Sequence, residues 1–191
     1  MSAPKQEKPY PASLAFLLNN PVKRWIHPPS GLLDMLEIKP TDTVVDFGCG
    51  PGFYTLGIAQ RARSAVAVDI SPEMLRKVQD AATRAGATNI QFIQSDGRRL
   101  QLGDRSADKV LLVRVYHEVQ EHEAVLREFG RVLRPEGRLI LVERVKKGLL
   151  PGPPVQDPDA LKEEVESSGL FRLQSTLPRG GLSVLIFGKS A

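Results

Sequence analysis

The chain has 191 residues, of which 41% are hydrophobic and 25% charged, with a formal net charge of +4. This length suits one domain with a sizeable core. No apolar run approaches the roughly 18 residues of a membrane-spanning helix, and no cleavage-type segment follows the short apolar stretch at 14–18, so we expect a cytoplasmic protein without a signal peptide. The single cysteine, Cys49, excludes an internal disulfide and a cysteine-rich metal site.

The first 30 residues form an expected N-terminal extension, and residues 31–191 form the expected single domain. A short helix at 13–20 would end at Pro21, and a basic, aromatic stretch follows that contains Lys23, Arg24, Trp25 and His27. This stretch has two open interpretations, a lid over a ligand site or an amphipathic cover on a sheet. A second short helix is expected from Pro29 to Leu36.

Apolar runs then predict seven strands, at 44–45, 65–68, 90–93, 109–113, 139–142, 171–176 and 182–187. Helical spacing predicts helices that begin at Ser71, cover 125–133 and cover 161–168, the last with its acids outward. We expect helices between the first six strands, which implies an α/β fold with a mostly parallel sheet covered on both faces. The last two strands have a short connection and should pair as an antiparallel hairpin.

A glycine loop follows the first strand, in the sequence TVVDFGCGPGFYT at 43–55. Glycines allow backbone to approach a ligand closely, and a following helix supplies free N–H groups. Dinucleotide-binding loops require G-x-G-x-x-G. Phe53 or Thr55 stands where the third glycine is needed, so the spacing disfavours a nicotinamide-dependent oxidoreductase.

Acidic residues also follow the second and third strands. In a doubly wound sheet, ligands bind at the carboxyl ends of the strands. Asp69 lies 19 residues after Gly50 and either accepts hydrogen bonds from both ribose hydroxyls of a nucleoside or caps a turn. Asp96 precedes Gly97 and is either a ligand contact or a turn residue.

The motif D-x-G-x-G-x-G at 46–52 resembles the signature of class I S-adenosylmethionine-dependent methyltransferases. Tyr116-His117-Glu118 and LRPEGRLILVE at 133–143 resemble the methyltransferase type 11 group, which includes the ubiquinone/menaquinone-biosynthesis enzymes. The resemblance runs from about Leu32 to the end of the chain. It implies a Rossmann-like seven-stranded sheet with a reversed seventh strand.

The resemblance also implies the cofactor, S-adenosylmethionine, with S-adenosylhomocysteine as product. The residues that it would place around the cofactor are Asp46, Gly48, Cys49, Gly50, Gly52, Asp69, Ile70, Asp96, Gly97 and Arg114. Asp96 would receive the adenine amino group, with Ile70 and Gly97 beside the ring. Arg114 would offer its backbone carbonyl to the methionine ammonium. Asp46 would lie near the methionine end, or hold the loop by accepting backbone N–H bonds, and both roles can coexist.

His117 and Tyr116 are the candidates for chemistry at the acceptor. A histidine titrates near neutrality and suits a general base, but it can equally pack the loop or position the cofactor. Tyr116 either lines the acceptor pocket or belongs to the core. Cys49 is expected to pack rather than react, and His122 is expected to be solvated. Methyl transfer from a sulfonium needs alignment more than acid–base chemistry, so no catalytic motif is required.

The sequence therefore predicts a methyltransferase that acts on a small-molecule acceptor, as a monomer or homodimer and without a metal. An anionic acceptor would suit Lys23, Arg24 and Arg114. Two alternatives stay open: a protein or RNA methyltransferase, and a non-catalytic S-adenosylmethionine-binding protein. A nucleic-acid partner is disfavoured because the chain shows no appended nucleic-acid module and no aromatic-basic RNA motif.

Overall fold

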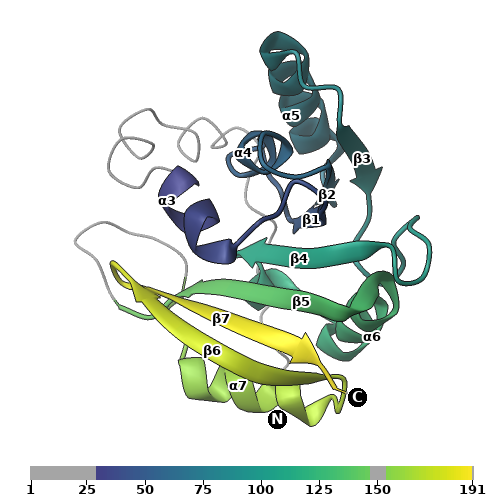
Figure 1. Cartoon of the computed structure of the whole chain (residues 1–191). Helices are drawn as coiled ribbons and strands as arrows, with labels where there is room; N and C mark the ends of the chain where they lie inside the picture. Colours follow the sequence, from purple (N-terminus) through teal and green to yellow (C-terminus); the bar gives the residue numbers. More distant parts are fainter. Residues whose placement is uncertain (1–28, 147–153, 191) are drawn as a thin grey trace.

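The computed structural model describes residues 29–146 and 154–190 (Figure 1). The expected helix at 13–20 and most of the expected extension and lid at 1–30 lie outside this range. Seven strands form one sheet in the order β3-β2-β1-β4-β5-β7-β6, and β7 alone runs in the direction opposite to the other six. The strands are β1 (Thr43–Phe47), β2 (Ser64–Asp69), β3 (Ile90–Gln94), β4 (Ala107–Val113), β5 (Leu133–Arg144), β6 (Phe171–Arg179) and β7 (Leu182–Lys189). This confirms the predicted fold class.

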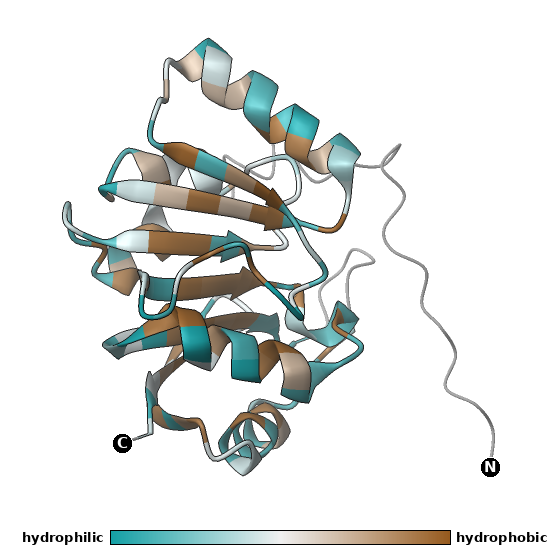
Figure 2. Cartoon of the chain, turned by 90° about the vertical axis from the view of Figure 1, so that its right-hand side faces the viewer, coloured by the Kyte–Doolittle hydropathy of each residue, from teal (hydrophilic) through white to brown (hydrophobic). Residues whose placement is uncertain are grey.

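Helices cover both faces of the sheet (Figure 1). They are α3 (Pro29–Leu33), η2 (Asp34–Leu36), α4 (Thr55–Ala59), α5 (Pro72–Ala85), η3 (Tyr116–Glu118), α6 (His122–Val132) and α7 (Pro158–Ser167). One core cluster joins α3, η2 and α4 to alternate residues of the sheet, including Val44 and Ile140. The other joins α6 and α7 to the intervening residues, including Val45 and Leu141. Burial on both faces explains the continuous apolar runs of the strands, which are brown in Figure 2.

The start and end of α5 follow the expected local signals. Ser71 Oγ accepts a hydrogen bond from the backbone N–H of Met74 at 3.3 Å, and proline occupies the first helical turn. Gly86 ends the helix in the left-handed conformation, with φ of 65°. Met74, Val78 and Ala82 are buried at four-residue spacing, so one stripe of the helix packs on β2 and β3 while the opposite side faces solvent (Figure 2).

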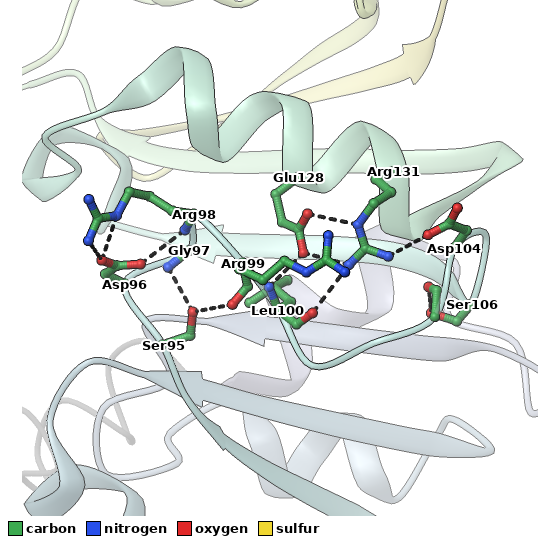
Figure 3. Close-up of polar contacts among 11 residues, drawn as sticks. Ser95, Asp96, Gly97, Arg98, Arg99, Leu100, Asp104, Ser106, Glu128 and Arg131 are labelled. Atoms are coloured by element: carbon green, nitrogen blue, oxygen red, sulfur yellow. Dashed lines mark hydrogen bonds and ion pairs between the residues drawn. The ribbon is translucent and has the colours of Figure 1, made fainter.

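A helix was predicted between each of the first six strands and the next. This prediction is wrong between β3 and β4, which residues 95–106 connect without a helix. Side chains of α6 hold this loop instead. Glu128 Oε1 accepts from the backbone N–H of Leu100 at 2.6 Å, and Arg131 donates to Glu128 and to the carbonyl of Leu100 (Figure 3). The sequence of the loop gives no sign of these partners, which lie about 30 residues away.

The boundary between α6 and β5 also differs from the expectation. Helix α6 ends at Val132, and Leu133 already pairs with Ala107 of β4. The register then shifts, and regular pairing resumes at Arg138. Pro135 lacks an N–H and cannot donate to the ladder, so the strand begins irregularly, before the apolar run at 139–142 that was expected to form it.

The β6–β7 pair forms the expected antiparallel hairpin, but its loop is only two residues long because β6 extends to Arg179, beyond the expected strand end at 176. Gly180 and Gly181 both have positive φ, 50° and 88°, as a type I′ turn requires. Within residues 29–146 and 154–190, no helix is long and apolar enough to cross a membrane.

Candidate functional site

The glycine loop lies where the strand order reverses. Strand β1 pairs in parallel with β2 on one side and β4 on the other, so successive crossovers leave the centre of the sheet in opposite directions and open a crevice at the carboxyl ends. The loop begins at this crevice. Cys49 N–H donates to the carbonyl of Val68 at 2.9 Å, and Gly50 N–H donates to Asp69 Oδ2 at 2.8 Å. The loop after β1 is thus bonded directly to the end of β2.

Two of the loop glycines cannot carry a side chain. An added Cβ at Gly52, where φ is 84°, would lie 2.3 Å from Val78 Cγ2 of α5. At Gly48, where φ is 67°, it would lie 2.5 Å from Val115 Cγ1. The loop therefore packs tightly between α5 and the segment after β4, which fixes the path of its backbone.

Asp69 is part of the structure of the loop and is also placed as a ligand group. Its Oδ2 accepts from Gly50 N–H, and its Oδ1 accepts from Ser71 N–H, both at 2.8 Å. Each carboxylate oxygen has a further lone pair that can accept a hydroxyl. Burial raises the pKa of Asp69, although the backbone N–H bonds lower it. The turn-capping interpretation is therefore correct, and it leaves room for the ribose interpretation.

A pocket of about 360 Å³ lies next to Asp69, at the carboxyl ends of β2 and β3. It is lined by Ile70, Gln94, Ser95 and Asp96, so the structure brings together two of the residues expected around the adenine, Ile70 and Asp96. Ile70 is 57% exposed, which leaves an apolar surface open to a flat ligand.

Arg98 holds the carboxylate of Asp96 in place (Figure 3). Its Nε and Nη2 lie 2.8 and 2.7 Å from Asp96 Oδ2, and its backbone N–H donates to Asp96 Oδ1 at 3.1 Å. These hydrogen bonds lower the pKa of Asp96. Gly97 has a φ of 93°, and an added Cβ would lie 2.6 Å from Phe47, so its place beside the pocket also depends on the absence of a side chain.

Asp46 lies buried beneath the loop and accepts a hydrogen bond from Thr55 Oγ1 at 2.5 Å. The expectation that it accepts backbone N–H bonds from the loop is wrong, because the bond comes from a side chain at the start of α4. Burial raises the pKa of Asp46 to about 6, and the negative charge of Asp69 contributes to this rise. The hydrogen bond from Thr55 acts in the opposite direction and lowers the pKa. A second carboxylate therefore lies close to Asp69 at the head of the crevice.

Arg114 follows β4 with a φ of 58°, a left-handed conformation that is unusual for a residue with a side chain. Its N–H donates to the carbonyl of Val142 at 2.8 Å. The chain thus turns sharply out of the sheet at the expected place. The role of its carbonyl toward an ammonium group stays a prediction.

His117 is paired with a buried glutamate that the sequence interpretation missed. Its Nδ1 lies 3.0 Å from Oε2 of Glu143, the residue before the end of β5, whose side chain is fully buried. Oε1 of Glu143 accepts from Tyr116 N–H at 3.0 Å. One carboxylate therefore fixes both the backbone of η3 and the imidazole. A glutamate that follows the apolar run LILV at the end of a strand was the available signal.

Tyr116 belongs to the core. Its side chain is fully buried in the cluster under α6 and α7, and its hydroxyl donates to Glu164 Oε1 of α7 at 3.1 Å. These contacts favour the core interpretation over the pocket wall. Burial, followed by the charge of Glu164 and its hydrogen bond, raises the pKa of Tyr116.

The expectation of a solvated His122 is wrong. Its ring stacks on Tyr116 with centroids 4.3 Å apart, and its two ring nitrogens face Glu164 and the carbonyl of Tyr116. Glu164 therefore contacts Tyr116 and His122, whereas the acids of this helix were expected to face solvent. The three side chains connect η3 and the start of α6 to α7.

Cys49 is buried, and burial raises the pKa of its thiol, with the charges of Asp46 and Asp69 acting in the same direction. It packs with Ala67 and Val78, which supports a packing role. Within the part of the chain that the structure describes, no group of histidine, cysteine and carboxylate side chains could hold a metal ion.

Curated relatives match 61–65% of the chain. The chain is 31% identical to the arsenite methyltransferase of Halobacterium salinarum over 127 residues. This match covers 65% of this chain and 32% of that protein. The chain is also 32% identical to the ubiquinone/menaquinone biosynthesis C-methyltransferase of Ectopseudomonas mendocina over 120 residues, 61% of this chain and 47% of that protein. The matched region thus spans about a third to a half of these relatives.

A solved structure extends the similarity of fold to nearly the whole chain. An S-adenosylmethionine-dependent methyltransferase from Aquifex aeolicus superimposes with a TM-score of 0.86, over 96% of this chain and all of that one, at 21% identity. A family model described as a methyltransferase domain matches residues 45–141, about half of the chain, from β1 to β5. The chain therefore belongs to the methyltransferase type 11 family of S-adenosylmethionine-dependent methyltransferases.

Proposed function

We propose that this protein transfers the methyl group of S-adenosylmethionine to a small-molecule acceptor by in-line displacement. The observation that carries the proposal is the bond between Gly50 N–H and Asp69 Oδ2 at the switch point. It joins the glycine loop to the one carboxylate at the end of β2, beside the pocket lined by Ile70 and Asp96.

The residues at this edge fit the parts of the cofactor in order. Asp69 would accept the ribose hydroxyls, because each of its oxygens keeps acceptor capacity after its backbone bond. Asp96, held ionised by Arg98, would accept from the adenine amino group above Ile70. Asp46 would offer a carboxylate at the methionine end, where a positive ligand favours its charged form. When bound, S-adenosylmethionine supplies a methyl group already activated on a sulfonium.

His117 is the residue that we propose to accept a proton from the acceptor, where the acceptor carries one. When His117 donates through Nδ1 to Glu143, the lone pair of the neutral ring lies on Nε2, and Glu143 stabilises the imidazolium that forms. Glu143 acts through His117 and is a positioning residue. Alignment in a closed crevice remains the main requirement of the reaction.

A small acceptor is supported by the relatives, whose names refer to arsenite and to quinones. The chemistry of arsenite is less well supported in this chain. Soft metalloids bind to thiolates, whereas the one cysteine is buried beneath the loop with a raised pKa. We therefore propose an organic acceptor.

Calorimetric titration with S-adenosylhomocysteine, with NAD as the control ligand, tests the cofactor site. We expect binding of S-adenosylhomocysteine alone, and a loss of about 100-fold or more in Asp69→Ala, because two hydrogen bonds to a charged acceptor are removed. Asp80→Asn, an exposed change on α5, should keep the affinity of the wild type. Unchanged affinity in folded Asp69→Ala would refute the assignment.

Turnover then separates the proposed function from its alternatives. Release of S-adenosylhomocysteine with members of a panel of small organic acceptors is the expected result. Methyl incorporation only into the protein or RNA fraction of a cell extract would indicate a macromolecular methyltransferase. Binding of the cofactor without turnover on either would indicate a non-catalytic binding protein.

A further inference from the structure

Tyr116, the first residue of η3, is bound through its N–H, its carbonyl and its hydroxyl. Its N–H donates to Glu143 Oε1 at 3.0 Å, and its hydroxyl donates to Glu164 Oε1 at 3.1 Å. Its carbonyl accepts from Val119 N–H at 3.1 Å and lies 3.1 Å from His122 Nε2. Because β5, α6 and α7 supply three of these partners, the short turn η3 is attached to three elements at once.

His122 lies between two groups that accept hydrogen bonds. Its Nε2 faces the carbonyl of Tyr116, and its Nδ1 faces Glu164 Oε1, which already accepts from the hydroxyl of Tyr116. A carbonyl and an ionised carboxylate have no proton to donate, so the two contacts require a donor at each ring nitrogen. The pair of His122 and Glu164 therefore holds one proton more than a neutral imidazole and an ionised carboxylate carry together.

The surroundings of the ring favour this extra proton on the imidazole. In water an imidazole is a stronger base than a carboxylate by about two orders of magnitude. The ring of His122 also stacks on the ring of Tyr116, with centroids 4.3 Å apart and an angle of 17° between the planes. A cation over the face of an aromatic ring is stabilised by the quadrupole of that ring, so the stacking favours an imidazolium.

The contacts of Tyr116 determine the position of the residue that follows it, His117. Glu143 binds both residues, the N–H of Tyr116 through one oxygen and Nδ1 of His117 through the other, each at 3.0 Å. A turn of three residues has little stability of its own, so both contacts depend on where Tyr116 is held. His122 and Glu164 hold it there, through its carbonyl and its hydroxyl.

We propose that His122, as an imidazolium paired with Glu164, is a positioning residue for His117 in the methyl-transfer reaction. The charged pair holds the first residue of η3 on α7 and so keeps Nδ1 of His117 within bonding distance of Glu143. This inference rests on the proposed function, in which His117 accepts a proton from the acceptor, and it adds the two side chains that keep this histidine in place.

Nitrogen-15 NMR of the imidazole rings at pH 7 tests the charge of His122. The chain has three histidines, so substitution of each one assigns its signals. We expect both ring nitrogens of His122 to be protonated in the wild type and only one in Glu164→Gln, because the amide can donate to Nδ1. Glu163→Gln, an exposed change on the same helix, should leave the ring as in the wild type. A His122 that carries a single proton in the folded wild type overturns the proposal.

The same spectra test the effect on His117. In His122→Ala and in Glu164→Ala, His117 should lose the preference for a proton on Nδ1 that its contact with Glu143 predicts for the wild type. Glu164→Gln should retain this preference, because its amide can donate to His122 and accept from the hydroxyl of Tyr116. This rescue separates the positioning of His117 from a general loss of helix contacts. An unchanged His117 in both alanine variants contradicts the proposed role.

S-adenosylhomocysteine distinguishes a local effect from a loss of fold. Its affinity should stay within about twofold of the wild type in His122→Ala and in both Glu164 variants, because these side chains lie outside the proposed cofactor site. If an alanine variant does not bind it, the comparison of the wild type with Glu164→Gln decides the proposal. Failure of S-adenosylhomocysteine to bind the wild type contradicts the proposed function instead, and the charge of His122 is still measured.

Turnover shows whether the pair acts on the reaction. With a hydroxyl-bearing acceptor that the wild type methylates, kcat should fall at least about tenfold in His122→Ala, whereas KM for S-adenosylmethionine should stay within about twofold. Glu164→Gln should retain most of the wild-type kcat. An equal kcat in the wild type and in folded His122→Ala would refute the positioning role.

Discussion

At the scale of single residues, Asp46 shows how burial changes the chemistry of a carboxylate. The residue is only 2% exposed, and one hydroxyl, that of Thr55, donates a hydrogen bond to its carboxylate. Burial therefore raises its pKa from 3.8 to about 6. Ionising such a buried carboxylate costs free energy in the protein without ligand, and a positively charged ligand reduces this cost. The methionine end of S-adenosylmethionine carries positive charge on its sulfonium and ammonium groups.

This raised pKa predicts a specific pH dependence of stability. Below pH 4 Asp46 is protonated in both the folded and the unfolded state, whereas between pH 4 and 6 the folded state holds its proton and the unfolded state releases it. The free energy of unfolding of the wild type should therefore fall relative to Asp46→Asn as pH rises through this window, by up to about 3 kcal/mol.

Urea unfolding of both proteins from pH 4 to 7.5 measures this difference. Asp80→Asn, at an exposed position of α5, should follow the wild type at every pH. A difference between Asp46→Asn and the wild type that stays constant across the window would show that Asp46 is ionised in the folded protein throughout.

Glu143 gives a second prediction at this scale. Glu143→Gln should lower the free energy of unfolding by about 1–3 kcal/mol, because an amide cannot accept from both Tyr116 N–H and His117 Nδ1 without turning a donor toward one of them. Nitrogen-15 NMR of the imidazole should show Nδ1 protonated in the wild type and a loss of that preference in the variant. Glu163→Gln, exposed on α7, should change stability by no more than about 0.5 kcal/mol. A wild-type ring protonated only at Nε2 would contradict the assigned pairing.

At the scale of elements, the glycine loop and α5 form one packed unit. Gly52→Ala should destabilise the protein by about 2–5 kcal/mol, because the methyl group meets Val78 at 2.3 Å and the backbone is left-handed. Gly103→Ala is the control, since nothing lies within 4 Å of its added Cβ. Thermal and urea unfolding measure both variants. The double variant Gly52→Ala, Val78→Ala should be more stable than the sum of the two single changes predicts, and strict additivity would show that Val78 is not the obstacle.

The elements also show where sequence interpretation succeeds. The strands, α5 and the hairpin carry their signals locally, in apolar runs, in the Ser71 cap and in the pair Gly180-Gly181. The connection from β3 to β4 carries no such signal. Glu128 and Arg131 of α6 hold this connection through hydrogen bonds (Figure 3). The expected alternation of strands and helices therefore predicted a helix there that the structure does not contain.

At the scale of the whole molecule, binding at the crevice should stabilise the entire domain, because the unfolded chain has no site. S-adenosylhomocysteine at 100 times its dissociation constant should add about 2.7 kcal/mol and raise the melting temperature by about 5–10 °C in a chain of this size. Differential scanning fluorimetry measures the shift. NAD at the same concentration should produce none, and a shift with NAD alone would show that the glycine loop had been misinterpreted.

Short-range patterns in the sequence were sufficient to predict the fold class, the order of the strands along the chain and the cofactor. These patterns are the apolar runs, the spacing of Gly48, Gly50 and Gly52, and an acid after each of two strands. The residues expected around the cofactor stay a prediction. Their hydrogen bonds, such as that from Thr55 to Asp46, could not be predicted from the sequence, since a bond depends on a rotamer and on the direction of a buried side chain.

The partners of His117 and Tyr116 became visible only in the tertiary structure. His117 and Glu143 are 26 residues apart, and Tyr116 and Glu164 are 48 apart. Such pairs have no signature along the chain, because their proximity is created by strand order and side-chain direction, and these exist only once the sheet has formed.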